Sequence, residues 1–156
     1  MILRLALIGF GNVGREFAKL LLSKSEWLRR SEDIDVEVLA IATKRHGSLL
    51  SDRALDLKRV LYEIDEKDTL RGYGQESTDL SPLEIIKRCD ADIMVELTTL
   101  NIESGQPAID HIKAAFHAGL SVITTNKGPL SFAYEDLRRA ARSRGAQFRF
   151  EGTVMD

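Results

Sequence analysis

The chain has 156 residues with a formal net charge of −2, and 44% of the residues are hydrophobic while 29% are charged. This length and mixed composition fit one globular domain and exclude collagen-like, low-complexity and disordered proteins. The near balance of acidic and basic residues argues against a nucleic-acid or membrane-surface partner. The single cysteine cannot form an internal disulfide and no apolar run reaches the roughly 20 residues that cross a bilayer, so we expect a protein of the cytoplasm.

Short apolar runs and amphipathic segments alternate along the chain. The apolar runs predict strands over 2–8, 36–43, 93–97, 120–124 and 147–151. Apolar residues at three- and four-residue spacing predict helices over 13–22, 49–64, 82–88, 107–118 and 134–144, and residues 65–80 are expected to form a loop. The alternation predicts an α/β fold of the Rossmann type, in which a doubly wound, mostly parallel sheet carries helices on both faces. We assign 1–156 to this one domain.

A glycine-rich sequence, GFGNVG, lies between the first predicted strand and the first predicted helix. It comprises Gly9, Phe10, Gly11, Asn12, Val13 and Gly14. In this context the first glycine permits a tight turn, the second lets the backbone approach a pyrophosphate, and the third lets the helix pack closely on the strand. The free N–H groups at the helix start favour an anion. The sequence therefore predicts a dinucleotide site, and the alternative is a structural turn without a ligand.

The end of the second predicted strand bears on which dinucleotide binds. A free ribose 2′-hydroxyl usually meets Asp or Glu at this position, whereas here Thr43 is followed by Lys44 and Arg45. Two cations beside a small hydroxyl residue suit a 2′-phosphate, which favours NADP over NAD. The alternative is a solvated basic loop, and use of NAD stays possible.

Two further segments follow strands of the predicted sheet. Thr98 and Thr99 follow the third strand, where their hydroxyls could bond a cofactor or form a turn. Lys127 follows the fourth strand, between Asn and Gly-Pro, where its ammonium could stabilise negative charge on a carbonyl oxygen. The alternative for Lys127 is an ordinary surface lysine. The histidines and Cys89 show no metal-ligand spacing.

Taken together, GFGNVG, ELTT with the following GQPA, TTNKGPL and the closing EGTV resemble the homoserine dehydrogenase family. The resemblance spans the whole chain but only the N-terminal, nucleotide-binding part of that family. It implies reversible, NAD(P)-dependent interconversion of L-homoserine and L-aspartate 4-semialdehyde, on the route to threonine and methionine. A downstream catalytic and dimerising domain is expected beyond this chain, so the 156-residue chain alone is expected to be inactive.

The same resemblance assigns roles to particular residues. Residues 10, 12, 13, 98 and 99 would contact the cofactor, and Lys127 would contact both cofactor and substrate as the catalytic lysine of this part. Relatives bind a sodium ion at EGTV, which implies the Glu151 side chain and the carbonyls of Val154 and Asp156 as ligands. The full-length protein is expected to be a homodimer acting on a small molecule.

Two other functions stay open at this point. One is a non-catalytic dinucleotide-sensing module, which the short chain favours and the lysine of TTNKGPL opposes. The other is a dehydrogenase for another small amino-acid substrate, because the substrate pocket lies mostly outside this sequence.

Overall fold

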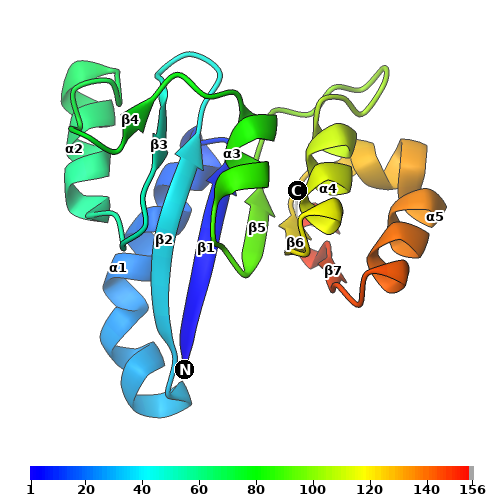
Figure 1. Ribbon diagram of the computed structural model, residues 1–156, viewed down its shortest axis with the longest axis horizontal. Coiled ribbons are helices and arrows are strands. Elements are labelled where there is room, and N and C mark those ends of the chain that lie inside the picture. Colours follow the sequence, from blue (N-terminus) through cyan, green and yellow to red (C-terminus); the bar gives the residue numbers. More distant parts are fainter. Residues whose placement is uncertain (155–156) are drawn as a thin grey trace.

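The computed structural model describes residues 1–154 and contains a seven-stranded sheet in the order β4-β3-β2-β1-β5-β6-β7. The strands are β1 (Ile2–Ile8), β2 (Asp35–Ala42), β3 (Ser48–Leu50), β4 (Ser77–Thr78), β5 (Ile93–Glu96), β6 (Ser121–Thr124) and β7 (Phe148–Arg149). All neighbours are parallel except β3, which is antiparallel to both β2 and β4. Figure 1 shows the sheet crossing the molecule, with α2 at one end and α5 at the other.

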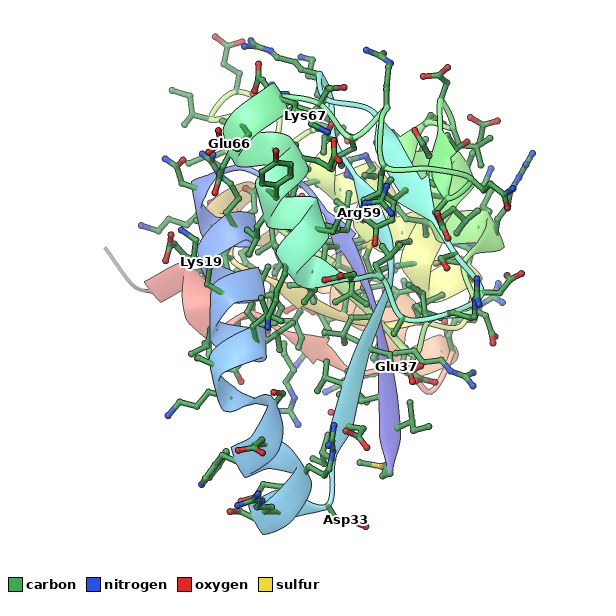
Figure 2. All side chains as sticks on the ribbon, turned by 90° about the vertical axis from the view of Figure 1, so that its left-hand side faces the viewer. Lys19, Asp33, Glu37, Arg59, Glu66 and Lys67 are labelled. Atoms are coloured by element: carbon green, nitrogen blue, oxygen red, sulfur yellow. The ribbon has the colours of Figure 1, made fainter. Side chains whose placement is uncertain are left out.

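Helices cover both faces of the sheet. They are α1 (Asn12–Glu32), α2 (Leu57–Lys67), α3 (Pro82–Arg88), α4 (Ala108–His117) and α5 (Lys127–Ser143), followed by a 3₁₀ turn, η1 (Glu151–Val154). One core cluster joins the sheet to α1 and α2, which lie side by side in Figure 2, and a second joins it to α3, α4 and α5. This arrangement confirms the predicted Rossmann-type fold. Within residues 1–154, none of the helices combines the length and the apolar character that crossing a bilayer requires.

The helix predicted over 49–64 is wrong in its first half. Residues 48–50 instead form β3, which pairs with the edge of β2, and Leu49 is fully buried there. Helix α2 begins only at Leu57, because the side chain of Asp56 accepts hydrogen bonds from the amides of Lys58 and Arg59 and so caps the helix there. Leucine spacing alone fits both readings, and pairing with the neighbouring strand decides between them.

Other boundaries also differ from the sequence prediction. Helix α1 continues ten residues past Leu22, because neither glycine nor proline interrupts it before Asp33 adopts a left-handed conformation. The expected loop 65–80 contains the short β4, and α5 starts at Lys127 with a kink at Ala133. The last strand is limited to β7, since Glu151 already belongs to η1. Helix α3 begins at Pro82, after a capping box formed by Ser81 and Glu84.

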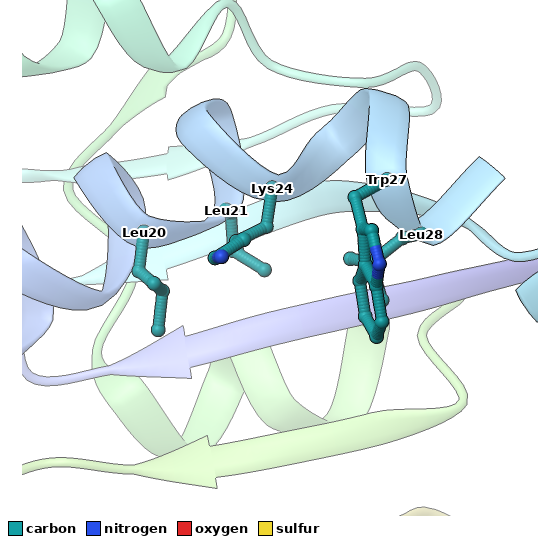
Figure 3. Close-up of a pocket in the computed structure, with 5 residues that line it drawn as sticks. All are labelled: Leu20, Leu21, Lys24, Trp27 and Leu28. Atoms are coloured by element: carbon teal, nitrogen blue, oxygen red, sulfur yellow. The ribbon is translucent and has the colours of Figure 1, made fainter. Parts of the chain in front are cut away.

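The C-terminal half of α1 carries an apolar groove. Figure 3 shows the residues that line it, which are Leu20, Leu21, Lys24, Trp27 and Leu28. Two of these side chains are more than half exposed, Leu20 at 51% and Trp27 at 54%. The groove lies away from the glycine-rich loop, which sits at the opposite end of the same helix.

Candidate functional site

The order of the strands reverses between β1 and β5. From β1 the chain moves outward through β2, β3 and β4, and then returns to place β5 on the other side of β1. In open α/β sheets, ligands bind at the carboxyl ends of the strands at such a reversal. The glycine-rich loop follows β1 and the segment 97–99 follows β5, so both lie at this point.

Gly9 brings these two segments into direct contact. Its φ is +99°, and a Cβ built there would lie 2.6 Å from the carbonyl carbon and oxygen of Leu97 and 2.8 Å from the amide nitrogen of Thr98. Contacts this short are incompatible with any side chain, so only glycine fits. Its amide donates to the carbonyl of Ala42 at 2.9 Å, which ties the loop to the end of β2 as well.

The start of α1 is open toward solvent. Gly11 is the N-cap residue and supplies no side-chain cap, the first turn holds no acidic residue, and a Cβ on Gly11 would meet nothing within 4 Å. A Cβ on Gly14, in contrast, would lie 2.9 Å from the carbonyl oxygen of Gly9, so Gly14 serves the close packing of helix and loop. Uncapped helix N–H groups facing open space suit an anionic ligand.

The other loop residues take different positions. The Phe10 side chain is buried in the core, so Phe10 can meet a ligand only through its backbone. Asn12 and Val13 are exposed, and the Asn12 side-chain oxygen accepts a hydrogen bond from Arg15 at 2.7 Å. Arg15 is in turn paired with Asp65 on α2 at 3.2 Å. The first turn of α1 is thus braced against α2.

The turn after β2 presents the two predicted cations. The Thr43 hydroxyl donates to the carbonyl of Gly47 at 2.7 Å and accepts from the amide of His46 at 2.8 Å, so it serves the turn. The segment after α2 is hydrogen-bonded to this turn, since the amide of Leu70 donates to the carbonyl of His46 at 2.6 Å. Lys44 and Arg45 are exposed on this fixed turn.

A buried carboxylate lies beneath the ends of β5 and β6. Glu96 is fully buried and accepts hydrogen bonds from the amide of Thr98 at 3.0 Å, from the Thr98 hydroxyl, and from the Thr124 hydroxyl at 3.1 Å. Burial raises the pKa of the Glu96 carboxyl, and the hydrogen bonds from Thr98, Thr124 and Asn126 partly oppose that rise in pKa. The Thr98 side chain is therefore turned inward, whereas Thr99 is exposed.

Lys127 is the first residue of α5 and lies beside this network. Asn126 caps the helix by accepting from the amide of Gly128 at 3.0 Å, and its side-chain amide donates to the carbonyl of Thr98 at 3.1 Å. Gly128 approaches Gly105 closely, since a Cβ on Gly128 would lie 2.8 Å from the Gly105 Cα. The exposed Lys127 side chain thus starts from a backbone that is held on two sides.

The expected cation ligands are only partly described. The Glu151 carboxylate is exposed, accepts from the amide of Phe150 at 3.0 Å and lies 3.9 Å from Arg149. Val154 ends η1, and Asp156 lies outside the described residues. Within residues 1–154, no three His, Cys, Asp or Glu side chains come together as a metal site. The sodium site stays a prediction.

The structure therefore brings the glycine-rich loop, residues 98–99 and Lys127 to one edge of the sheet, with Lys44 and Arg45 on the turn after β2. Sequence reasoning gave no role to Glu96 or Asn126. The available signal was a charged residue closing the apolar run IMVE, one residue ahead of two threonines. That pattern indicates a buried carboxylate in need of hydrogen-bond donors.

Comparisons with known proteins agree on one family. A sequence model described as "Homoserine dehydrogenase, NAD binding domain" matches residues 9–151. The homoserine dehydrogenase of Methanocaldococcus jannaschii is 34% identical, in a match that covers 95% of this chain and 44% of that protein. The NAD(+)-dependent homoserine dehydrogenase of Pseudomonas canavaninivorans is 30% identical, in a match that covers 97% of this chain and 43% of that protein. A hyperthermophilic archaeal homoserine dehydrogenase solved in complex with NADPH superposes with a TM-score of 0.82 at 29% identity, over 99% of this chain and 45% of that one. The chain thus spans less than half the length of these relatives.

Proposed function

The chain belongs to the homoserine dehydrogenase family, as its NAD-binding domain, and on this basis we propose that it binds NADP(H) for the interconversion of L-homoserine and L-aspartate 4-semialdehyde. The observation that carries the proposal is the open space above Gly11 at the uncapped start of α1, where the order of strands reverses. The pyrophosphate would lie there, held by backbone N–H groups.

The preference for NADP rests on the turn after β2. Lys44 and Arg45 are exposed where a 2′-phosphate would lie, and no acidic residue occupies positions 43–47 to bond a free 2′-hydroxyl. Because the relatives include one named as NAD(+)-dependent and one solved with NADPH, family membership alone does not select the cofactor.

The residues at the edge of the sheet have distinct roles in the proposed reaction. The cofactor, when bound, supplies or accepts the hydride. Thr98 and Thr99 would border the nicotinamide, while the Lys127 ammonium would bond the substrate oxygen and stabilise the negative charge that develops on it. The main contribution of the protein is to hold substrate and cofactor close together in the orientation that the reaction needs.

The remainder of the enzyme is also part of the proposal. The relatives are more than twice as long as the matched region, so we infer that a second domain supplies the substrate pocket and a homodimer contact. We propose that the enzyme is soluble and acts in the cytoplasm, which fits this chemistry. No step is assigned to the sodium ion.

The test is homoserine-dependent reduction of NADP⁺ by the longer protein that carries this chain. Lys127→Ala should lower kcat/KM by at least about 100-fold, since oxyanion-stabilising groups are worth about that much. Lys113→Ala, which changes an exposed lysine within α4, is the matched control and should keep wild-type activity. Cofactor binding without any homoserine turnover would contradict the proposed substrate and would instead indicate a sensing module or a dehydrogenase for another small amino acid.

A further inference from the structure

We propose that Glu96 is a positioning residue, which locks the segments after β5 and β6 into one unit and so fixes where Thr98 and Lys127 meet the cofactor and substrate. The inference rests on the proposed function for the identity of the ligands. The locking itself depends only on the geometry of the described residues.

The carboxylate is the shared acceptor for the two strand ends. One of its oxygens accepts from both the amide and the hydroxyl of Thr98, and the other accepts from the Thr124 hydroxyl at 3.1 Å. An ionised carboxylate is acceptor-only, so it can serve several donors at once without turning a proton toward any of them. Glu96 therefore joins residues that are 26 positions apart in the sequence, Thr98 on one side and Thr124 on the other.

The hydrogen-bond network extends from Glu96 to Asn126 and Gly128, the two neighbours of Lys127. The Thr124 hydroxyl donates its one hydrogen bond to Glu96, so its lone pairs are free to accept a hydrogen bond from the amide of Asn126 at 3.0 Å. The Asn126 side chain then accepts from the amide of Gly128 at 3.0 Å and donates to the carbonyl of Thr98 at 3.1 Å. The network closes on itself, and Lys127 lies between two residues whose amides belong to it.

A purely structural role accounts poorly for this carboxylate. Burying a carboxylate is costly, and an apolar residue at the end of β5 would fill the same space without that cost. What an apolar residue cannot do is accept hydrogen bonds from three donors, the Thr98 amide, the Thr98 hydroxyl and the Thr124 hydroxyl, and so join the ends of β5 and β6. Fully satisfied buried networks give rigidity and a single arrangement, which is what a hydride-transfer site needs from its flanking loops.

The variants separate locking from general stability. Glu96→Gln keeps the volume but replaces one acceptor oxygen with a donor, so either the bond from Thr124 or both bonds from Thr98 are lost. Thr124→Val removes the relay from the β6 side and serves as the second variant if Glu96→Gln does not fold. Asp92→Asn is the matched control, because Asp92 precedes the opposite end of β5 and accepts the amide of Arg4 at 2.8 Å, away from the two loops.

Amide hydrogen exchange measures the lock directly. In Glu96→Gln and Thr124→Val, exchange should speed up at least about tenfold at Asn126 and Gly128, the change expected for one lost hydrogen bond, while the amides of β1 keep their wild-type rates. Asp92→Asn should leave Asn126 and Gly128 unchanged. Faster exchange throughout β1, or no change at Asn126 and Gly128, would overturn the inference.

A second readout connects the lock to the ligand. The Kd for NADPH, followed by its fluorescence, should rise about tenfold in Glu96→Gln, the same amount as one lost hydrogen bond, and should stay at the wild-type value in Asp92→Asn. Local loosening with an unchanged Kd would overturn the positioning role. If the wild-type chain binds neither NADPH nor NADH, the proposed function fails, and hydrogen exchange alone still decides whether Glu96 locks the two loops.

Discussion

Gly9 and Gly11 are two residues apart in one loop, yet replacing them with alanine should affect different properties, the stability of the fold at Gly9 and the binding of the dinucleotide at Gly11. At Gly9 the new Cβ would lie 2.6 Å from the backbone of Leu97, and the residue would have to keep a φ of +99°. The unfavourable φ costs about 1–2 kcal/mol and the overpacking about 1–3 kcal/mol, so Gly9→Ala should lose about 2–5 kcal/mol of unfolding free energy. For a chain of this size each kcal/mol lowers Tm by about 2–4 °C.

At Gly11 the φ is −80° and a Cβ would meet nothing within 4 Å. Gly11→Ala should therefore cost less than about 1 kcal/mol, from its N-cap position alone. The new methyl group would stand where the pyrophosphate approaches the backbone. Loss of one charge-assisted hydrogen bond to the phosphate should weaken dinucleotide binding about 10- to 100-fold.

Urea unfolding followed by circular dichroism gives both stabilities, and calorimetric titration gives the affinities. A Gly9→Ala variant as stable as the wild type would contradict the predicted clash with Leu97. A Gly11→Ala variant that unfolds as readily as Gly9→Ala, or that binds the dinucleotide with unchanged affinity, would contradict the predicted role of Gly11.

Three further predictions follow from other parts of the structure. Replacing Lys44 and Arg45 together with alanine should weaken NADPH binding about 10- to 100-fold and leave NADH binding unchanged, as parallel calorimetric titrations would show. Because burial raises the pKa of Glu96, the native state binds a proton more tightly than the unfolded chain, whose glutamates titrate near a pKa of about 4.3. The wild type should therefore lose stability relative to Glu96→Gln in urea titrations as pH rises from about 4 through the raised native pKa, and the difference should stay constant above it, where the carboxylate is ionised; an offset that is independent of pH throughout would contradict this. Ser81→Ala removes the side chain that caps α3 and should cost about 1 kcal/mol in a thermal melt, whereas Ser23→Ala within α1 is the control and should cost less.

The sequence predicts those features that depend on local pattern. Apolar runs and helical spacing are properties of neighbouring residues, so the amino-acid order alone indicates the alternation of strands and helices and the position of the glycine-rich loop. The capping box at Ser81 is likewise formed by residues close in sequence. The open, mostly parallel sheet is predicted from the same alternation, whereas the spatial order of its strands comes from the structure.

Features that depend on partners distant in sequence were missed. Residues 48–50 form a strand because β2 offers them an edge, and the leucines by themselves fit a helix equally well. Glu96 acquires its role from Thr124, and that contact exists only once β6 lies beside β5. The Phe10 side chain is directed into the core by the packing of α1, so the resemblance assigned it a ligand contact that only its backbone can make.

Every role proposed for the glycine-rich loop requires that this chain binds a dinucleotide there. The decisive measurement is calorimetric titration of the folded 156-residue chain with NADPH and, in parallel, with NADH. We expect saturable binding of both, with a lower Kd for NADPH than for NADH. A chain that is folded by circular dichroism and yet binds neither nucleotide would contradict the central claim.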